Sequence, residues 1–460
     1  MNNRNIKAFR SIPLLWLLMP LMLNSCLVGS KYNLPELPKP ESYATVIADK
    51  GVSDSIANIT WFQLFGDSIL NRYVKTALES NSDLKIARLR LEQAGLNYSL
   101  SKSNQLPSIG YKAAASLNDP SSDLFQAVGT LSWEIDFWGR LKYAKKSAYN
   151  QMLAGEEGRN LILTNVASNV AVLYFQLRDL DNRKEIVSNT IRLRTEYYEM
   201  IRSRFLGGET AELDMLQAAQ QLELSKATLA SIDRELAAVE RSLNILMGGI
   251  PSRLMRGLKN TEQGVKVVIP VGLPSDLVEN RPDVRQAAFT LQAQYAQIGV
   301  AQALRLPTIN LTGALGFSSL ELSSLFKSGS DYSSFTGALL GPVFEFGKNR
   351  KRVEYQKKEA EIAAETYVKT WLNALADVEN ALTAIETYDR ESKARTAQAE
   401  YSKKALELSR ARYTAGYTDY TEVLIAEQNL LESELQASSI KAKQLSAVIG
   451  LYKALGGGWR

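Results

Sequence analysis

The chain has 460 residues, of which 45% are hydrophobic and 22% charged, enough for two or three ordinary domains with a large core. Its net charge of +5 is small for this length and it has no basic run, which argues against nucleic acid as a partner. The sequence contains no histidine, so an enzyme would lack the usual general base and a metal site the commonest ligand. With a single cysteine, no disulfide within the chain is possible.

The first 25 residues have the pattern of a secretion signal. Basic residues precede an apolar run over residues 12–23 that is too short for a comfortable membrane span. Residues 23–26, Leu-Asn-Ser-Cys, form a lipobox, which predicts that Cys26 is lipidated and becomes the first mature residue. A cysteine left over in an ordinary export signal is the alternative. Residues 26–60, rich in proline and polar residues, are then expected to form a tether.

Two stretches in the first part of the mature chain alternate between apolar and polar residues, the period of a strand with two different faces. In the second stretch Leu131, Trp133, Ile135 and Phe137 occupy the apolar positions. A proline-free run follows, which as one helix would be about 95 Å long. For residues 61–250 we therefore predict strands at about 107–118 and 124–138 and long helices at about 141–206 and 211–247.

The same order of elements recurs about two hundred residues later, which indicates an internal duplication. Leu106-Pro107-Ser108-Ile109 matches Leu306-Pro307-Thr308-Ile309, and Trp138-Gly139-Arg140 matches Phe346-Gly347-Lys348. After a linker at 251–270, the second repeat at 271–460 is predicted to hold strands at about 307–318 and 332–346 and helices at about 349–413 and 419–455. The alternation is poorest between Tyr332 and Phe346.

The long helices have the spacing of coiled coils. In the first repeat, apolar residues follow one alternating 4-and-3 register from Val166 to Phe205, which is broken only by Lys184 and Arg194. The return helix has the same spacing, and the second repeat keeps it with smaller residues. Such seams predict helices that pack at a shallow angle along their whole length.

Four two-faced strands cannot close a membrane barrel, because the smallest bacterial barrels have eight, and an open sheet in lipid leaves backbone groups unpaired. Several chains must therefore share one barrel. Two chains would give eight strands and a filled interior, whereas three would give twelve and an open lumen. Glu134 and Asp136 are expected to face the lumen, and Leu131, Trp133 and Ile135 the lipid.

The motifs, taken in order, resemble the TolC-like outer-membrane factor family, most closely its OprM/NodT-type efflux lipoprotein branch. The matching residues are the lipobox, Trp61-Phe62 through Asp67, Leu106-Pro107, Ser132 to Arg140, Glu279 to Asp283, Gly341 to Phe344, and Arg412-Tyr413 through Asp419-Tyr420. The resemblance implies an α+β membrane protein of duplicated helix–strand pair–long helix–turn–helix units. Three copies would form a twelve-stranded transmembrane β-barrel continued by a periplasmic α-helical barrel.

The same resemblance implies the protein's location and partners. It implies a homotrimer in the bacterial outer membrane that extends into the periplasm and is anchored by the covalent lipid on Cys26, with no cofactor. The implied partners are a periplasmic adaptor (membrane fusion) protein and an inner-membrane RND-type transporter. Such a protein is not an enzyme; it is the passive exit duct of a tripartite efflux pump for drugs or other small toxic compounds.

The helix turns farthest from the barrel are the candidate gate and adaptor contact. The candidate gate residues are Arg410, Tyr413, Tyr417, Asp419 and Glu422. The candidate turn and adaptor-contact residues are Gly207, Gly208, Glu209 and Gly416, whose glycines suit a reversal that needs positive φ. In the plainer alternative, Asp419 only caps a helix, as Thr210 would in the first repeat, and Glu422 is a solvated charge. In a trimer an acidic tip would favour cations.

Other functions remain open from the residues alone. The duct of a type I secretion or metal-efflux system has the same architecture, although no methionine cluster or histidine pair favours a metal route. A structural coiled-coil lipoprotein would explain the helices but leaves the two-faced strands uncovered. A periplasmic hydrolase using Glu134 and Asp136 as an acid/base pair would lack a supporting nucleophile.

Overall fold

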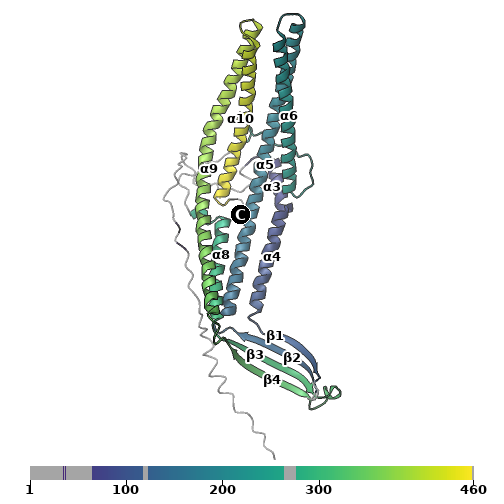
Figure 1. Ribbon diagram of the computed structural model, residues 1–460, viewed down its shortest axis with the longest axis vertical. Helices are drawn as coiled ribbons and strands as arrows, with labels where there is room; N and C mark the ends of the chain where they lie inside the picture. Colours follow the sequence, from purple (N-terminus) through teal and green to yellow (C-terminus); the bar gives the residue numbers. More distant parts are fainter. Residues whose placement is uncertain (1–34, 36, 38–64, 118–122, 264–275, 458–460) are drawn as a thin grey trace, which may run out of the picture. The chain divides into compact units, whose positions relative to one another are not determined.

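The computed structural model describes residues 35, 37, 65–117, 123–263 and 276–457. The signal segment 1–25, Cys26 and all of the 26–60 tether except residues 35 and 37 therefore lie outside the described residues. The described elements are α3 (Ser68–Ser80), α4 (Ser82–Ser103), β1 (Ser108–Ser116), β2 (Leu124–Ile135), α5 (Arg140–Leu206), α6 (Glu212–Leu246), α7 (Asp276–Glu279), α8 (Pro282–Ala303), β3 (Thr308–Ser319), the 3₁₀ turn η3 (Leu322–Ser324), β4 (Asp331–Leu340), α9 (Lys348–Thr414) and α10 (Tyr420–Ala454) (Figure 1).

The chain divides into two compact units, which α5 and α9 both join. The sheet unit contains Arg90–Glu156 and Gln286–Lys369, and the helical unit contains Leu37–Leu89, Glu157–Arg285 and Thr370–Arg460. By length and composition alone, α5 is apolar enough to cross a membrane. More than half of its apolar window, 56%, is however buried against the rest of the protein, as expected of a helix in a bundle core.

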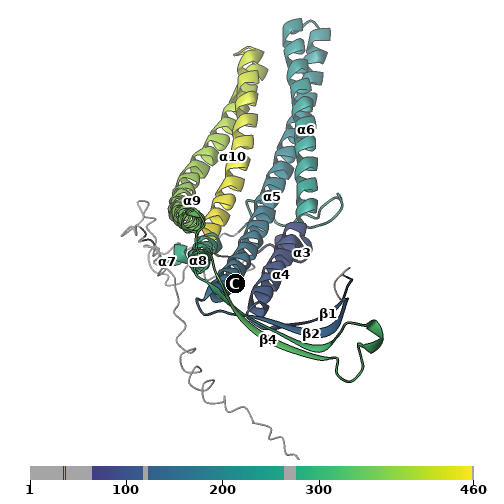
Figure 2. The ribbon, with the colours of Figure 1, turned by 60° about the horizontal axis from the view of Figure 1, so that its bottom comes forward.

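The four strands form one antiparallel sheet in the order β1-β2-β3-β4 (Figure 2). The central pair, β2 and β3, comes from different repeats, and it runs from Phe125 opposite Ser319 to Ile135 opposite Ile309. Each outer strand has one neighbour within the described residues. The described residues of a single chain therefore form an open sheet with two free edges.

The pairing register gives the sheet one apolar and one polar face. Trp133 lies opposite Leu311 and Ile135 opposite Ile309, and directly opposed residues share a face. The same face carries Ile109, Leu131, Leu315, Phe335 and Leu339, all of them exposed in the single chain. The opposite face carries Ser108, Thr130, Ser132, Glu134, Asn310, Thr312 and Thr336. The alternation predicted from the sequence thus forms two continuous faces across four strands.

Three strands end earlier than the sequence predicts: β1 by two residues, β2 by three and β4 by six. The strand predicted at 332–346 ends at Leu340, because its partner Thr308 is preceded by Pro307, which has no N–H to continue the ladder. The strand predicted at 124–138 ends at Ile135, because the next residues turn into α5 through Gly139 at φ 79°. Helix boundaries differ from the predicted ones by at most one residue at either end of the four long helices, and the end of α5 at Leu206 is as predicted.

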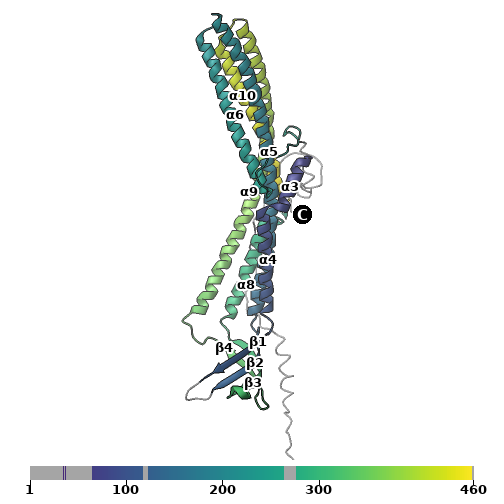
Figure 3. The ribbon, with the colours of Figure 1, turned by 90° about the vertical axis from the view of Figure 1, so that its right-hand side faces the viewer.

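In the helical unit, α5 with α6 and α9 with α10 form two antiparallel hairpins (Figures 1 and 3). The heptad positions of α5 make its core, since Val170, Leu177, Leu180, Val187 and Ile201 are each at most 1% exposed. Arg194, which breaks that register in the sequence, is also buried, at 3% exposure. The charged position is therefore part of the core, and its partner is described below.

The internal duplication extends to backbone conformation. Gly139 and Gly347, Gly208 and Gly416, and Gly248 and Gly456 are three pairs separated by 208 residues, and all six glycines have φ between 71° and 79°. Each pair occupies the same junction: before the long helix, at the hairpin turn, and after the return helix. The duplicated order of helix, strand pair, long helix, turn and helix is confirmed.

In each repeat, the residue just before α4 or α8 bonds the C-terminal end of the return helix, which is α6 in the first repeat and α10 in the second. Asn81 donates its side-chain N–H to the carbonyl of Leu246 at 2.8 Å. Its counterpart Arg281 donates to the carbonyl of Ala454 at 3.2 Å and also bonds Asp283 and Asp377, at 2.8 and 2.9 Å. Both residues thereby satisfy a carbonyl that a helix C-terminus leaves unpaired.

Asp67 fixes the segment that connects the two repeats. It is 1% exposed and accepts hydrogen bonds from Tyr174, Gln263 and the N–H of Leu258, in addition to capping α3. Burial alone would raise the pKa of Asp67, but these hydrogen bonds outweigh it and hold the pKa below its usual value. Gly257 passes so close to Asp67 that a Cβ there would lie 2.3 Å from the carboxylate.

Candidate functional site

The turn between α9 and α10 is built by backbone geometry and a side-chain cap. Gly416 adopts φ 76°, and the N–H groups of Gly416 and Tyr417 bond the carbonyls of Tyr413 and Arg412, which closes the end of α9. Asp419 then caps α10 by accepting from the N–H of Thr421 at 3.0 Å. The turn is therefore rigidly specified at both helix ends.

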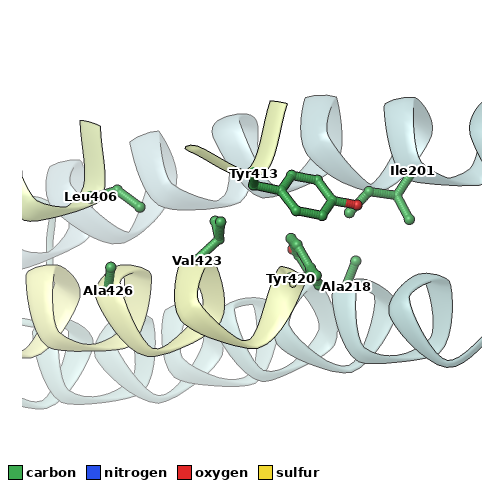
Figure 4. Close-up of a cluster of buried hydrophobic side chains, with 7 residues drawn as sticks. All are labelled: Ile201, Ala218, Leu406, Tyr413, Tyr420, Val423 and Ala426. Carbon is green, nitrogen blue, oxygen red and sulfur yellow. The ribbon is translucent and has the colours of Figure 1, made fainter. Parts of the chain in front are cut away.

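A small aromatic core lies directly behind this turn. Tyr413 from the end of α9 and Tyr420 from the start of α10 pack with ring centroids 5.4 Å apart. Figure 4 shows both rings between the two hairpins, with Ile201 and Ala218 of the α5/α6 hairpin on the same cluster. Tyr420 is 2% exposed, and burial followed by the nearby Glu427 carboxylate raises its pKa. The two tyrosines thus seal one hairpin tip against the other.

Behind the tyrosines, one carboxylate is shared by two arginines from different helices. Glu427 on α10 lies 3.4 Å from Arg194 on α5 and 2.7 Å from Arg410 on α9. The side chains of Arg194 and Glu427 are 3% and 4% exposed. Arg194 also donates to Ser225 and to the carbonyl of Gln221 on α6, so Arg194, Glu427 and Arg410 together connect all four helices.

Arg194, Glu427 and Arg410 form a buried charged triad, and removing one of its charges is expected to cost folding free energy. Burial lowers the pKa of Arg194, although the nearby Glu427 opposes that shift. Arg410 additionally stacks over the Tyr197 ring, with its guanidinium carbon 4.3 Å from the ring centroid. A buried ion pair is strongly destabilised when one partner is removed, because the other charge is left without compensation.

The structure brings most of the predicted gate residues together but gives them different environments. Arg410 belongs to the buried triad and Tyr413 to the aromatic core. Glu422 accepts from Thr418 and Ser409 and lies 3.7 Å from Arg412. Asp419 caps its helix, and Tyr417 is 80% exposed at the turn. Their role as a gate stays a prediction.

The corresponding turn of the first repeat has the same backbone but a different cap. Gly208 adopts φ 77°, and the N–H of Glu209 bonds the carbonyl of Arg204. Thr210 is not a cap, contrary to the sequence expectation: its hydroxyl bonds Asp214, and the capping position is Ala211, which makes no side-chain bond. Gly207, Gly208 and Glu209 are exposed, as is Gly416 in the second repeat.

The two carboxylates predicted to face the lumen take part in the junction between β2 and α5. Glu134 forms a two-pronged bond with Arg140, at 2.6 and 3.0 Å. Asp136 accepts from the N–H groups of Leu141 and Lys142, which are unpaired at the start of α5. Asp136 therefore has a structural role that the sequence analysis missed, and its replacement would disturb the helix start as well as any lumen lining.

Sequence reasoning also missed the centre of the site, Arg194 and Glu427. The available signal was Arg194 itself, a charged residue at a seam position of a coiled coil. Such a position predicts a buried polar partner, but the partner is 233 positions away on another hairpin. Only the packing of the two repeats identifies it.

Comparison with known proteins is consistent with this architecture. Residues 73–249 and 273–457 match the outer membrane efflux protein family. The chain is 31% identical to the solvent efflux pump outer membrane protein SrpC of Pseudomonas putida, over 98% of both chains. It is 27% identical to the cation efflux system protein CusC of Escherichia coli O157:H7 (96% of this chain, 97% of CusC). It is also 27% identical to the probable outer membrane lipoprotein SilC of Salmonella typhimurium (94% and 95%).

Solved structures share the fold over nearly the whole chain. The Campylobacter jejuni CmeC outer membrane channel superposes with a TM-score of 0.89 at 26% identity, covering 94% of this chain and 95% of CmeC. The open state of the Neisseria gonorrhoeae MtrE outer membrane channel gives a TM-score of 0.86 at 28% identity, covering 95% and 99%. The two-faced sheet, the duplicated hairpins and these matches agree: the chain belongs to the outer membrane efflux protein family and is an outer-membrane channel rather than an enzyme.

Proposed function

We propose that three copies of the chain close a twelve-stranded barrel and form the exit duct of a tripartite pump. The observation that supports this most directly is the open four-stranded sheet with one continuous apolar face. Its free edges on β1 and β4 need partners in lipid, and three sheets supply enough strands for an open lumen. A periplasmic adaptor and an RND-type inner-membrane transporter complete the pump.

The proposed cargo is small toxic organic compounds. SrpC, named for solvent efflux, is the relative that supports this cargo, at 31% identity over 98% of this chain. The test is to express the protein, with a candidate adaptor and RND-type transporter from the same organism, in a host whose own pumps are deleted. We expect raised resistance to solvents and hydrophobic drugs. Resistance to copper and silver ions alone would instead support the second candidate, a cation-efflux duct, which the similarity to CusC motivates.

Lipidation of Cys26 is the proposed anchor. The lipobox supports it, as does the similarity to SilC, a probable outer membrane lipoprotein. Cys26→Ser is expected to abolish incorporation of radiolabelled fatty acid and to slow delivery to the outer membrane. Incorporation of label equal to that of the wild type would contradict the anchor.

The α9/α10 turn is the proposed gate, with Arg410, Tyr413, Tyr417, Asp419 and Glu422 near the axis of the trimer. The rigid cap and the tyrosine pair support a defined closed state, in which each hydrogen bond contributes about 0.5–1.5 kcal/mol. Three symmetry-related copies would keep the duct closed until the adaptor binds the open form better.

Asp419→Ala, alone or with Tyr413→Phe, is accordingly expected to raise single-channel conductance in planar bilayers. It should also sensitise cells to large antibiotics such as vancomycin. The matched control is Asp214→Ala in the first repeat, which also removes a carboxylate from the start of a return helix. If correctly assembled Asp419→Ala trimers conduct like the control, the gate lies elsewhere.

A further inference from the structure

We propose that the helical unit contains a binding site for a small zwitterion, a molecule with one ammonium and one carboxylate group. The site is a partly open cavity of about 280 Å³ between α5, α9, α10 and the segment at 259–261. Its lining residues are Asn182, Ile186, Lys259, Asn260, Thr261, Ser392, Thr396, Ala399, Glu434, Ala437, Ser438 and Lys441. The inference is independent of the cargo, the gate and the partners proposed above.

The floor of the cavity is one face of α10 with opposite charges at its two ends. Glu434, Ala437, Ser438 and Lys441 are spaced i, i+3, i+4 and i+7, which puts them on one side of the helix. Two small residues lie between the carboxylate and the ammonium group. Seven residues correspond to about 10.5 Å along the helix axis at 1.5 Å per residue. The result is a trough with a negative and a positive end.

The facing helices provide polar walls. Ser392, Thr396 and Ala399 have the spacing i, i+4 and i+7 on α9, so they too present small side chains on one face. Asn182 on α5 donates to Ser438 at 2.9 Å, and the Ser438 hydroxyl bonds the buried Asp179. These hydrogen bonds therefore fix the positions of Asn182 on the wall and Ser438 on the floor.

Two acceptors in the lining have no partner within the described part of the chain. Glu434 makes no hydrogen bond or ion pair there; burial raises its pKa, and the charge of Lys403 opposes that shift. Asn260 is 7% exposed, and its amide donates to the carbonyl of Phe175, but its buried Oδ1 accepts no hydrogen bond. A buried acceptor without a partner, as Asn260 Oδ1 is, is rare and costly, whereas the half-buried carboxylate of Glu434 is open to a donor from the cavity. A donor-rich group would satisfy both acceptors.

The basic residues define the other half of the ligand. Lys441 donates to the neutral amide oxygen of Gln444 at 3.0 Å, which leaves its positive charge uncompensated by that contact. Lys259 is paired with Glu185 at 2.9 Å. A purely cationic ligand would meet repulsion from Lys441, and a purely anionic one from Glu434, so both charges are needed.

The dimensions favour a short chain between the two charges. An ammonium and a carboxylate separated by three methylene groups span about 5 Å, from bonds of about 1.5 Å. Charge-assisted hydrogen bonds of about 2.8 Å at each end extend this to about 10.5 Å, the rise along the helix axis between the backbone positions of Glu434 and Lys441. γ-Aminobutyrate is therefore the matched probe, and butylamine and butyrate are the same chain with one charge each.

The experiment measures binding of the three probes to the purified full-length protein in detergent by saturation-transfer NMR titration. We expect γ-aminobutyrate to bind about tenfold more tightly than butylamine or butyrate, because each analogue leaves one charged partner unsatisfied. This comparison uses only the wild-type protein, so it does not depend on whether a variant folds. Equal affinity for butylamine, or no saturable binding of γ-aminobutyrate, would overturn the proposal.

Two variants test which residue holds which charge. Glu434→Gln should remove the advantage of γ-aminobutyrate over butyrate, and Lys441→Met its advantage over butylamine. Glu432→Gln is the control, since this exposed carboxylate lies two residues from Glu434 on the same helix and does not line the cavity. If Glu434→Gln leaves the affinities of all three probes as they are in Glu432→Gln, the assignment is wrong.

Discussion

Glu427→Ala is expected to destabilise the helical unit by about 3–5 kcal/mol, the usual cost of removing one partner from a buried ion pair. The substitution leaves two guanidinium groups, those of Arg194 and Arg410, without their shared carboxylate. Arg194 suffers more, because it is 3% exposed and cannot reach water, whereas Arg410 keeps its contact with Tyr197. Since the triad holds the α9/α10 hairpin to α5, we also expect higher single-channel conductance.

The measurements are the guanidinium chloride concentration at the midpoint of unfolding and the single-channel conductance in planar bilayers. Glu432→Ala, which removes an exposed carboxylate five residues after Glu427 on α10, should change neither by a measurable amount. Replacing Arg194, Arg410 and Glu427 together by methionine should restore most of the stability, because no buried charge then remains. If Glu427→Ala unfolds at the same midpoint as Glu432→Ala, the triad does not stabilise the bundle.

Leu131→Arg is expected to destabilise the membrane-inserted protein by about 2–4 kcal/mol, the cost of an arginine on the lipid face near the bilayer midplane. Leu131 lies near the middle of β2, on the same face as Trp133 and Ile135, opposite Gly313 of β3. It is a better probe than Ile135, which is the last residue of the strand and lies close to the start of α5.

Thr130→Arg is the matched control, at nearly the same depth on the opposite face of the strand. If that face lines the lumen, Thr130→Arg should insert normally and change only ion selectivity. Insertion into vesicles, followed by protease protection and conductance, separates the two effects. Equal loss of insertion in both variants would mean that both faces contact lipid, which contradicts the barrel.

Local patterns in the sequence predict most of this fold. Alternation with a period of two predicts the faces of β2 and β3, and the 4-and-3 spacing predicts the long hairpins. Both patterns depend only on neighbours along the chain. The matched glycines, such as Gly208 and Gly416, mark the turns because positive φ is costly for other residues.

The remaining features of the fold and of the candidate site depend on contacts between segments that are distant in the sequence, and local patterns carry no information about such contacts. The end of β4 is set by Pro307 on the neighbouring strand, and the partner of Arg194 is on the other repeat. Asp136 was interpreted as a strand residue with a polar face, but the early turn of the chain makes it a helix cap. In the candidate gate, sequence chemistry found the turn residues, whereas the buried triad behind them required the packing.

Asn81 and Arg281 have a consequence for symmetry. The residue that bonds the end of the return helix is neutral in the first repeat and charged in the second, and the partner Asp377 of Arg281 corresponds to the neutral Asn169. In a trimer these joints alternate six times around the axis, three uncharged and three ionic. Salt should therefore weaken every second joint only, and mainly through the pair of Arg281 with Asp377, whose side chain is 55% exposed. The backbone of such a tube would have approximate sixfold symmetry, but at high ionic strength only three of its six joints would weaken, so its stability would have threefold symmetry.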